Sequence, residues 1–124
     1  MMNDRTYQKI YDEVANCILP ESEKVVIYLE YSENSYSYSF YEKINSKYVN
    51  AYDLPGVSEK KIDGAFRRID KVIMKERRKE KDDLWSNMTL SISKNGDMRA
   101  DFDYTDLSDG NYQYKKDWKK KYLK

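Results

Sequence analysis

The chain has 124 residues, close to the commonest size of one folded unit, and we expect a single domain over residues 1–124. Its 23 basic and 22 acidic side chains nearly cancel, so the overall charge favours neither nucleic acid nor a membrane surface as the partner. The absence of histidine excludes serine–histidine–aspartate triads, cysteine–histidine pairs and histidine-based zinc sites.

The cysteine content predicts the cellular compartment. Cys17 is the only cysteine, so the chain cannot form an internal disulfide, and this is typical of proteins in a reducing environment. The sequence contains neither a signal peptide nor a membrane-spanning apolar run. We therefore expect a cytoplasmic protein that does not contact a membrane.

A first helix is predicted near the N-terminus. Asn3 or Asp4 can cap it, Pro20 is expected to end it, and Cys17 is expected to lie within it. Apolar residues recur at intervals of three and four, which places them on one face of the helix. This face consists of Tyr7, Ile10, Tyr11, Val14 and Ile18.

Two strands are predicted next, because the spacing of apolar residues changes to two from Val25 onward. A polar loop of four residues, 32–35, separates the strands and brings their apolar faces to the same side. The sequence therefore predicts a β-hairpin. Its register pairs Tyr31 with Tyr36, Leu29 with Tyr38 and Ile27 with Phe40.

A short third strand is expected near residues 48–52, before a proline–glycine break. Ser58 can then cap a long second helix, which has a clear apolar stripe. The highly charged run 75–83 is expected to fray or protrude into solvent. The stripe consists of Ile62, Ala65, Phe66, Ile69, Val72 and Ile73.

Two further strands precede and follow the turn at Asn95 and Gly96. A two-residue loop would put the apolar residues of these strands on opposite faces. A three-residue loop, with Gly96 in the left-handed conformation, pairs Ile92 with Met98 and restores the match. We therefore predict a bulged hairpin. Its second strand directs Met98, Ala100, Phe102 and Tyr104 to the core.

A short basic helix is predicted from Tyr112 onward, with Tyr114, Trp118 and Tyr122 forming an aromatic stripe at intervals of four residues. The predicted order of elements is α-β-β-(β)-α-β-β-α. This order indicates an α+β fold, a single domain in which hairpins build an antiparallel sheet and helices pack on one face.

An acidic segment runs along the last predicted strand and beyond it. Asp101 and Asp103 alternate with core residues, so both are expected to point to solvent, about 7 Å apart. Asp106 and Asp109 continue the segment. Three interpretations stay open: a solvated strand face, a docking patch for a basic partner, or a metal-binding or catalytic carboxylate pair. The last is the weakest, because divalent metals need further oxygen ligands from other segments.

A small nucleic-acid-binding module is the alternative function. Tyrosines of the first hairpin could stack on bases, and basic residues of the second helix could contact phosphates. Aromatic residues also pack favourably within sheets, and acidic residues alternate with the basic ones along that helix. Core packing and a solvated helix are therefore the simpler interpretations.

Several short segments occur in a characteristic order that covers almost the whole chain. They are Ile18-Leu19-Pro20, Glu23-Lys24-Val25, Phe40-Tyr41, Asp53-Leu54-Pro55, Trp85, Met88-Thr89-Leu90, the turn at Gly96, Asp101-Phe102-Asp103-Tyr104 and Trp118-Lys119-Lys120-Lys121-Tyr122-Leu123. In this order and spacing the chain resembles the YezG/EsaG-type antitoxin family, immunity proteins for secreted nuclease toxins of Gram-positive bacteria.

The resemblance implies an antitoxin that neutralises a cognate nuclease-type toxin by direct protein–protein binding. It implies no catalytic residues, metal, cofactor or direct contact with nucleic acid. The sequence leaves the oligomeric state of the free protein open, with a monomer favoured. Acidic residues would speed the encounter with a basic toxin, and exposed aromatic residues would anchor it. The candidate partner-binding residues are Asp101, Asp103, Asp106, Asp109, Trp85, Tyr112 and Trp118.

Overall fold

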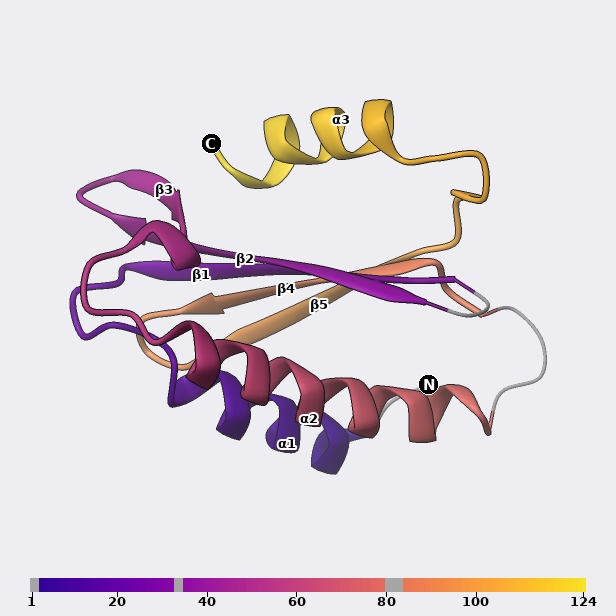
Figure 1. The fold of residues 1–124 in the computed structure, drawn as a ribbon, viewed down its shortest axis with the longest axis horizontal. Helices are drawn as coiled ribbons and strands as arrows, with labels where there is room; N and C mark the ends of the chain where they lie inside the picture. The colour runs from indigo at the N-terminus through magenta and orange to yellow at the C-terminus, as the bar shows by residue number, and fades with distance from the viewer. Residues whose placement is uncertain (1–2, 33–34, 80–83) are drawn as a thin grey trace. The chain divides into compact units, whose positions relative to one another are not determined.

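The computed structural model describes residues 3–32, 35–79 and 84–124, and in them the chain forms an α+β fold (Figure 1). Three α-helices and a five-stranded antiparallel sheet follow one another in the predicted order, which the third strand completes. The elements are α1 (Asp4–Ala15), β1 (Lys24–Tyr31), β2 (Tyr36–Ile44), β3 (Lys47–Asn50), the 3-10 helix η1 (Ala51–Asp53), α2 (Glu59–Arg77), β4 (Asn87–Ser93), β5 (Met98–Asp103) and α3 (Tyr112–Tyr122).

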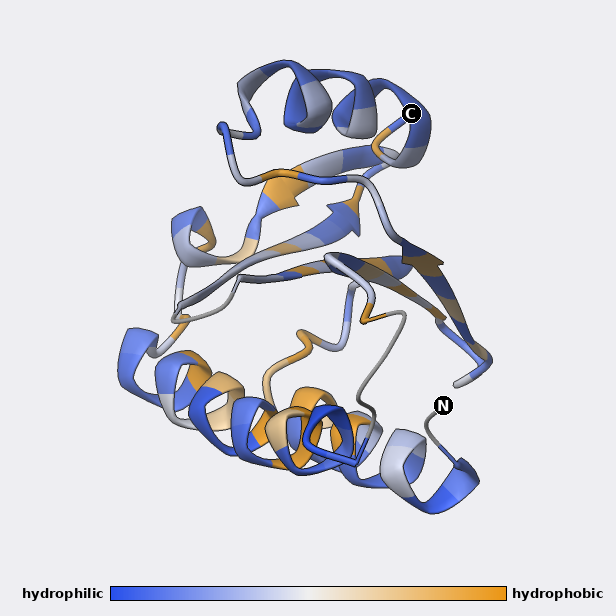
Figure 2. Ribbon diagram, turned by 90° about the vertical axis from the view of Figure 1, so that its right-hand side faces the viewer, coloured by the Kyte–Doolittle hydropathy of each residue, from blue (hydrophilic) through white to orange (hydrophobic). Residues whose placement is uncertain are grey.

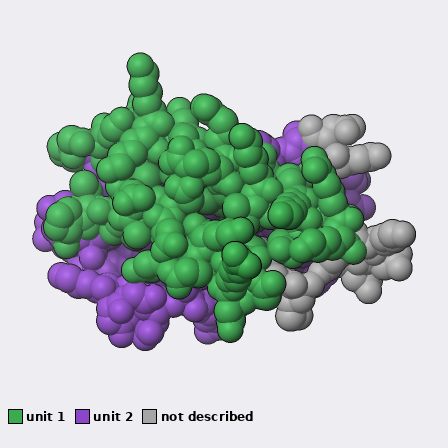
Figure 3. Space-filling model, turned by 90° about the horizontal axis from the view of Figure 1, so that it is seen from below, with its two compact units in different colours: residues 1–20, 55–84 green, residues 21–54, 85–124 purple. Residues whose placement is uncertain are grey.

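The chain divides into two compact units, coloured separately in Figure 3. The first comprises residues 1–20 and 55–84 and contains α1 and α2. The second comprises residues 21–54 and 85–124 and contains the sheet and α3. Among the described residues, no helix combines the length and the apolar character that crossing a membrane requires.

Both predicted helix caps of the first unit are confirmed. The Asn3 side chain accepts a hydrogen bond from the backbone N–H of Thr6 at 2.9 Å, and Ser58 accepts one from Lys61 at 3.2 Å. These bonds satisfy backbone donors that have no partner within the helix itself. The two helices run antiparallel, since the hydroxyl of Thr6, at the start of α1, donates to Glu76, near the end of α2.

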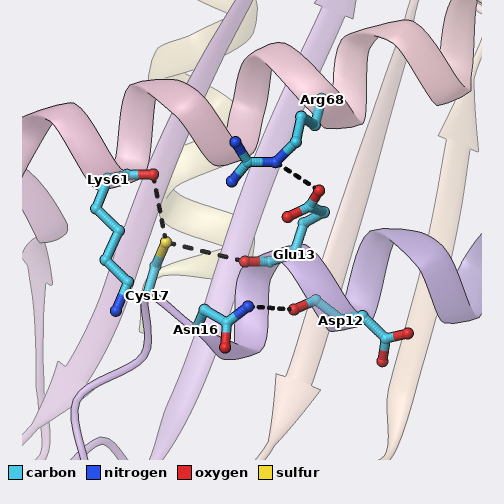
Figure 4. Close-up of polar contacts among 6 residues, drawn as sticks. All are labelled: Asp12, Glu13, Asn16, Cys17, Lys61 and Arg68. Carbon is cyan, nitrogen blue, oxygen red and sulfur yellow. Dashed lines mark hydrogen bonds and ion pairs between the residues drawn. The ribbon is translucent and has the colours of Figure 1, made fainter.

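The first helix ends earlier than predicted, at Ala15 rather than at Pro20. The reason is a tight turn, in which the backbone N–H of Cys17 bonds to the carbonyl of Val14 at 2.8 Å. Cys17 therefore lies outside the helix, and its thiol donates to the carbonyl of Lys61 at 3.8 Å (Figure 4). The figure also shows the ion pair between Arg68 and Glu13, which joins the two helices.

The second helix ends at Arg77. Its predicted stripe is largely buried, with Ile62, Phe66 and Ile69 at most 1% exposed. Of the charged run expected to fray, residues 80–83 lie outside the described residues.

The sheet has the strand order β3-β2-β1-β4-β5, and both predicted hairpin registers are confirmed. In the first hairpin Tyr31 faces Tyr36 as expected. In the second, Ile92 faces Met98, and Gly96 takes a φ of 93°, as the three-residue loop requires. Figure 2 shows apolar and polar residues alternating along the strands.

The third strand is shorter than predicted. It ends at Asn50, whose side chain accepts a hydrogen bond from the backbone N–H of Tyr52 at 3.0 Å and so begins the 3-10 helix. The turn before it was not predicted. Asn45 and Ser46 both have positive φ, 52° and 65°, which is the geometry of a tight two-residue hairpin turn.

The central strand β1 is buried on both faces, although the sequence predicts only one apolar face. Ile27 and Leu29 on the predicted face are at most 1% exposed. Val26 and Tyr28 on the other face are equally buried, and they form a cluster with Trp118 of α3. A continuous apolar run in a central strand thus provides the second face against which α3 packs.

The strained turn between β2 and β3 yields the first prediction. Ser46→Gly should raise the free energy of unfolding by about 0.5–1 kcal/mol, because glycine adopts a positive φ without steric cost. The backbone N–H of Ser46, which donates to Glu23 at 2.9 Å, is retained. Chemical denaturation measures the change. Ser37→Gly, at an exposed extended position of β2, is the matched control and should destabilise instead. A loss of stability in Ser46→Gly would contradict the argument.

Candidate functional site

Three aromatic side chains of α3 contact the sheet through their polar tips. The Tyr114 hydroxyl donates to Asp103 Oδ2 at 2.6 Å, and the Tyr122 hydroxyl donates to Asp101 Oδ2 at 3.0 Å. Between them, Trp118 Nε1 donates to Thr89 Oγ1 at 2.8 Å. The intervals of four residues place all three on one face, as predicted. The helix is thus attached to β4 and β5 by directed hydrogen bonds.

Trp118 is the apolar centre of this attachment. It is 4% exposed, and its ring meets Tyr28 edge-to-face at 5.0 Å between ring centres. The ammonium of Lys115 lies over both rings, 3.8 Å from the centre of Tyr28 and 4.5 Å from that of Trp118. Burial lowers the pKa of Lys115 to about 8, with a further contribution from Lys119, while Glu30 opposes the shift.

The carboxylate of Asp103 is fully engaged in local hydrogen bonds. Its Oδ1 accepts from the backbone N–H of Thr105 at 2.8 Å and from the Thr105 hydroxyl at 2.6 Å. Together with the bond from Tyr114, these donors hold the pKa of Asp103 below its ordinary value. The bond to the Thr105 backbone also turns the chain away from the sheet, so β5 ends at Asp103.

The expectation that Asp101 and Asp103 simply face solvent is wrong. Both are intermediate in exposure and accept hydrogen bonds from α3. Asp101 also accepts a hydrogen bond from Arg99 Nε at 3.1 Å. The physical reason is that α3 packs on the strand face to which the alternation directs these carboxylates. Their first role is to hold the helix.

A groove of about 920 Å³ lies between α3 and the strands β4 and β5. Asp101, Asp103 and Trp118 all line it, so the structure brings these three predicted residues together. Its charged lining consists of Asp101, Asp103, Asp117, Lys24, Arg99 and Lys121, so acidic and basic groups balance. Within the part of the chain that the structure describes, no three histidine, cysteine or carboxylate side chains converge as a metal site requires.

The most exposed aromatic residues lie in residues 104–112, which run from the end of β5 to the first residue of α3 and which we call the acidic loop. Tyr104 is 59% exposed and Tyr112 is 80% exposed, and Asp106 and Asp109 between them are also exposed. The exposure of Tyr112 agrees with the sequence prediction, whereas the core position predicted for Tyr104 is wrong. Tyr104 follows the end of β5, so the alternation of the strand no longer applies to it.

Hydrogen bonds within the acidic loop fix its path. Asp106 Oδ1 accepts from the backbone N–H of Ser108 at 2.9 Å, which also holds the pKa of Asp106 low. The backbone N–H of Gly110 bonds to the carbonyl of Leu107 at 3.0 Å, and Gly110 has a φ of 116°, which favours glycine. The loop therefore presents its side chains from an ordered backbone.

Trp85 and Trp118 are not exposed anchors, contrary to the prediction. Trp85 is 7% exposed, and its ring packs at 5.4 Å from Tyr31 and at 5.4 Å from Phe102. Trp85 thus packs on the face of the sheet that carries Tyr31 and Phe102. Large aromatic rings are attracted equally to cores and to interfaces, so their identity alone does not place them.

The sequence prediction missed a polar cluster at the start of α3. Glu30 accepts from the Tyr28 hydroxyl at 2.5 Å and from the Asn111 side chain at 2.8 Å. Lys115 donates to Ser39 Oγ at 3.0 Å beside it. The alternation of Val26, Tyr28 and Glu30 along β1 was the available signal, because it marks a second patterned face.

Comparison with known proteins identifies the family. Residues 3–124 match the family model described as "Immunity protein YezG-like". Two curated relatives are both named immunity protein YezG, from Bacillus subtilis (strain 168) and from Bacillus spizizenii (strain ATCC 23059 / NRRL B-14472 / W23). Each is 27% identical over 109 residues, which is 82% of this chain and 72% and 68% of the two relatives.

The chain therefore belongs to the YezG-like immunity protein family, which confirms the resemblance seen in the sequence. An immunity protein implies a cognate toxin as its partner, and such families are typically non-enzymatic.

The hydrogen bonds that the Asp103 carboxylate accepts yield the second prediction. Asp103→Ala should lower the free energy of unfolding by about 1–3 kcal/mol, because it removes the acceptor for Tyr114 and Thr105. Asp109→Ala, in the exposed part of the acidic loop, is the control and should leave stability nearly unchanged. Urea denaturation compares the two. Equal stability of both variants would contradict the structural role of Asp103.

The lowered pKa of Asp103 yields the third prediction, on acid stability. Folding lowers the pKa of Asp103, so its ionised carboxylate stabilises the fold at pH values above its ordinary pKa, near 3.8. This stabilisation disappears as the pH falls through the lower pKa of the folded state. The stability advantage of the native chain over Asp103→Asn should therefore be complete at pH 6 and shrink below about pH 4. Urea denaturation at a series of pH values measures this difference. A difference that stays constant down to pH 2 would contradict it.

Proposed function

We propose that this protein neutralises a cognate nuclease-type toxin by binding it directly, in the cytoplasm, through a surface centred on the acidic loop. Two exposed tyrosines, Tyr104 and Tyr112, flank the exposed carboxylates of Asp106 and Asp109. In a member of an immunity protein family, this arrangement is the observation that carries the proposal.

The aromatic residues supply the affinity in this proposal. Protein interfaces obtain most of their binding energy from a few anchors, among which tyrosine is enriched. Tyr112, with 80% of its surface exposed, gains more contact area on binding than any half-buried ring of the same helix. Tyr104 adds a second anchor at the opposite end of the loop.

The carboxylates supply the match to a nuclease. A nuclease binds the phosphates of its substrate with basic side chains, so its cleft attracts an acidic surface. Asp106 is ionised at neutral pH, and its hydrogen bonds from Ser108, which lower its pKa, keep it charged in more acidic solution as well. Opposite charges speed the encounter of two proteins and orient them before contact.

The ordered backbone of the loop favours tight binding. A surface that is already fixed loses less conformational freedom on association than a flexible one does. The side-chain bonds of Asp103 and Asp106 to Thr105 and Ser108 fix the loop before any partner arrives. In this proposal Asp101, Asp103 and Trp118 act from beneath the surface by holding α3, and Trp85 supports β5.

Base stacking on the first hairpin has less support. Tyr28 and Tyr31 of β1 are 1% and 5% exposed, and the ring of Tyr36 in β2, although 38% exposed, already stacks on Tyr31. An exposed aromatic platform is what single-stranded nucleic acid recognition requires. Antitoxin activity is therefore the function that the geometry supports best.

The fourth prediction tests the acidic loop with the toxin domain encoded beside this gene. Tyr112→Ala should weaken the complex about tenfold or more, through faster dissociation. Asp106→Lys/Asp109→Lys should slow association about tenfold at low salt, because like charges then meet. Surface plasmon resonance measures both rates, and thermal melting confirms that the variants are folded.

The matched control is Asp12→Lys/Glu21→Lys, which makes the same change in net charge at exposed positions outside the loop. It should leave the association rate within about twofold of the native value. Equal slowing by both double variants would show that only net charge matters. Native kinetics in every loop variant would place the toxin on another surface, and absence of any complex would overturn the antitoxin proposal itself.

A further inference from the structure

The strand β5 is the last strand on its side of the sheet, and the register shows which of its backbone groups face outward. The backbone N–H of Ser93 bonds to the carbonyl of Asp97 at 2.9 Å. Along an antiparallel ladder, hydrogen-bonded pairs alternate with non-hydrogen-bonded pairs. The pairs that Arg99 and Asp101 form with β4 are therefore hydrogen-bonded as well. The N–H and C=O groups of Met98, Ala100 and Phe102 therefore point to the open edge.

The side chains of β5 form a pattern centred on Ala100, with opposite charges next to it and apolar residues beyond them. Moving outward from it, one neighbour is basic Arg99 and the other is acidic Asp101, followed by apolar Met98 on one side and apolar Phe102 on the other. A second copy running antiparallel would place unlike charges opposite each other and apolar residues opposite each other. A strand with this pattern is complementary to itself.

We propose that two copies of this chain associate through their β5 edges, antiparallel and centred on Ala100, to form one continuous sheet. In this register Ala100 pairs with Ala100 of the second copy, and Met98 pairs with Phe102 in both directions. These three pairs use all the outward N–H and C=O groups of the three residues. Each hydrogen-bonded pair of an antiparallel ladder exchanges two bonds, so the contact contains about six.

Charge selects this register over its neighbours. Centred on Ala100, the pairing sets Arg99 opposite Asp101 of the second copy twice, at the closer non-hydrogen-bonded positions. Sliding by two residues one way sets Asp101 against Asp101, and sliding the other way sets Arg99 against Arg99. The guanidinium of Arg99 is available for the new ion pair, since its side chain is 79% exposed although it contacts Asp101 of its own strand.

Burial also favours this edge over the other. Met98, Ala100 and Phe102 are all only partly buried, so a second copy would remove further apolar surface from water. The opposite edge strand, β3, has four residues and passes directly into a 3-10 helix. It offers a shorter edge for strand addition.

Sedimentation of the free protein over a range of concentrations tests the proposal independently of any toxin. A contact of this size is at the small end of specific interfaces, so we expect a dissociation constant of roughly 10 µM to 1 mM. The average mass should rise from one chain toward two as concentration increases. A mass of one chain throughout, up to 1 mM, would overturn the proposal.

Two kinds of variant identify the surface. Arg99→Asp should weaken association about tenfold or more, and the swap Arg99→Asp/Asp101→Arg should restore it to within about threefold, because the opposite charges meet again. Ala100→Pro removes an outward N–H without touching the ladder with β4, so it should abolish association in a folded chain. Circular dichroism confirms folding. Association unchanged in both Arg99→Asp and Ala100→Pro would overturn the proposal even if the swapped variant fails to fold.

Discussion

The hydrogen bonds from the aromatic tips of α3 to β4 and β5 are the constraint on which the rest of this surface depends. Trp118, buried against Tyr28, fixes the height of the helix above the sheet, and Tyr114 and Tyr122 fix its direction along β5. By residue type α3 is largely hydrophilic (Figure 2), and it packs on the sheet through aromatic rings that also carry polar tips. Directed polar contacts therefore contribute much of the specificity with which it packs.

The same carboxylates connect packing with proposed function. Asp103 accepts bonds from α3 and from the first residues of the acidic loop, so the helix and the loop share one anchor. A loop anchored in this way can present Tyr104 and Tyr112 from fixed positions. The residues that the sequence marks as candidates for binding thus fall into two groups. Some hold the helix and the loop in place, and the others are exposed on the surface itself.

Local patterns made much of the fold predictable. The caps at Asn3 and Ser58 and the register at Gly96 depend on residues close in sequence, and all three are confirmed. Trp85 was predicted to be exposed but is buried, because its environment depends on rings that are distant in sequence. Tyr104 was predicted to lie in the core but is exposed, because the strand stops before it. Exposure is a property of the assembled structure, so no pattern in a single segment determines it.

Hydrogen–deuterium exchange of the free protein and of its complex with the cognate toxin domain tests the central claim most directly. The claim is that an ordered acidic loop, held by Asp103, is the surface that the toxin covers. The account predicts that backbone amides within residues 104–112 exchange more slowly in the complex, while those of α1 do not change. Protection confined to other segments, with residues 104–112 exchanging as in the free protein, would contradict it.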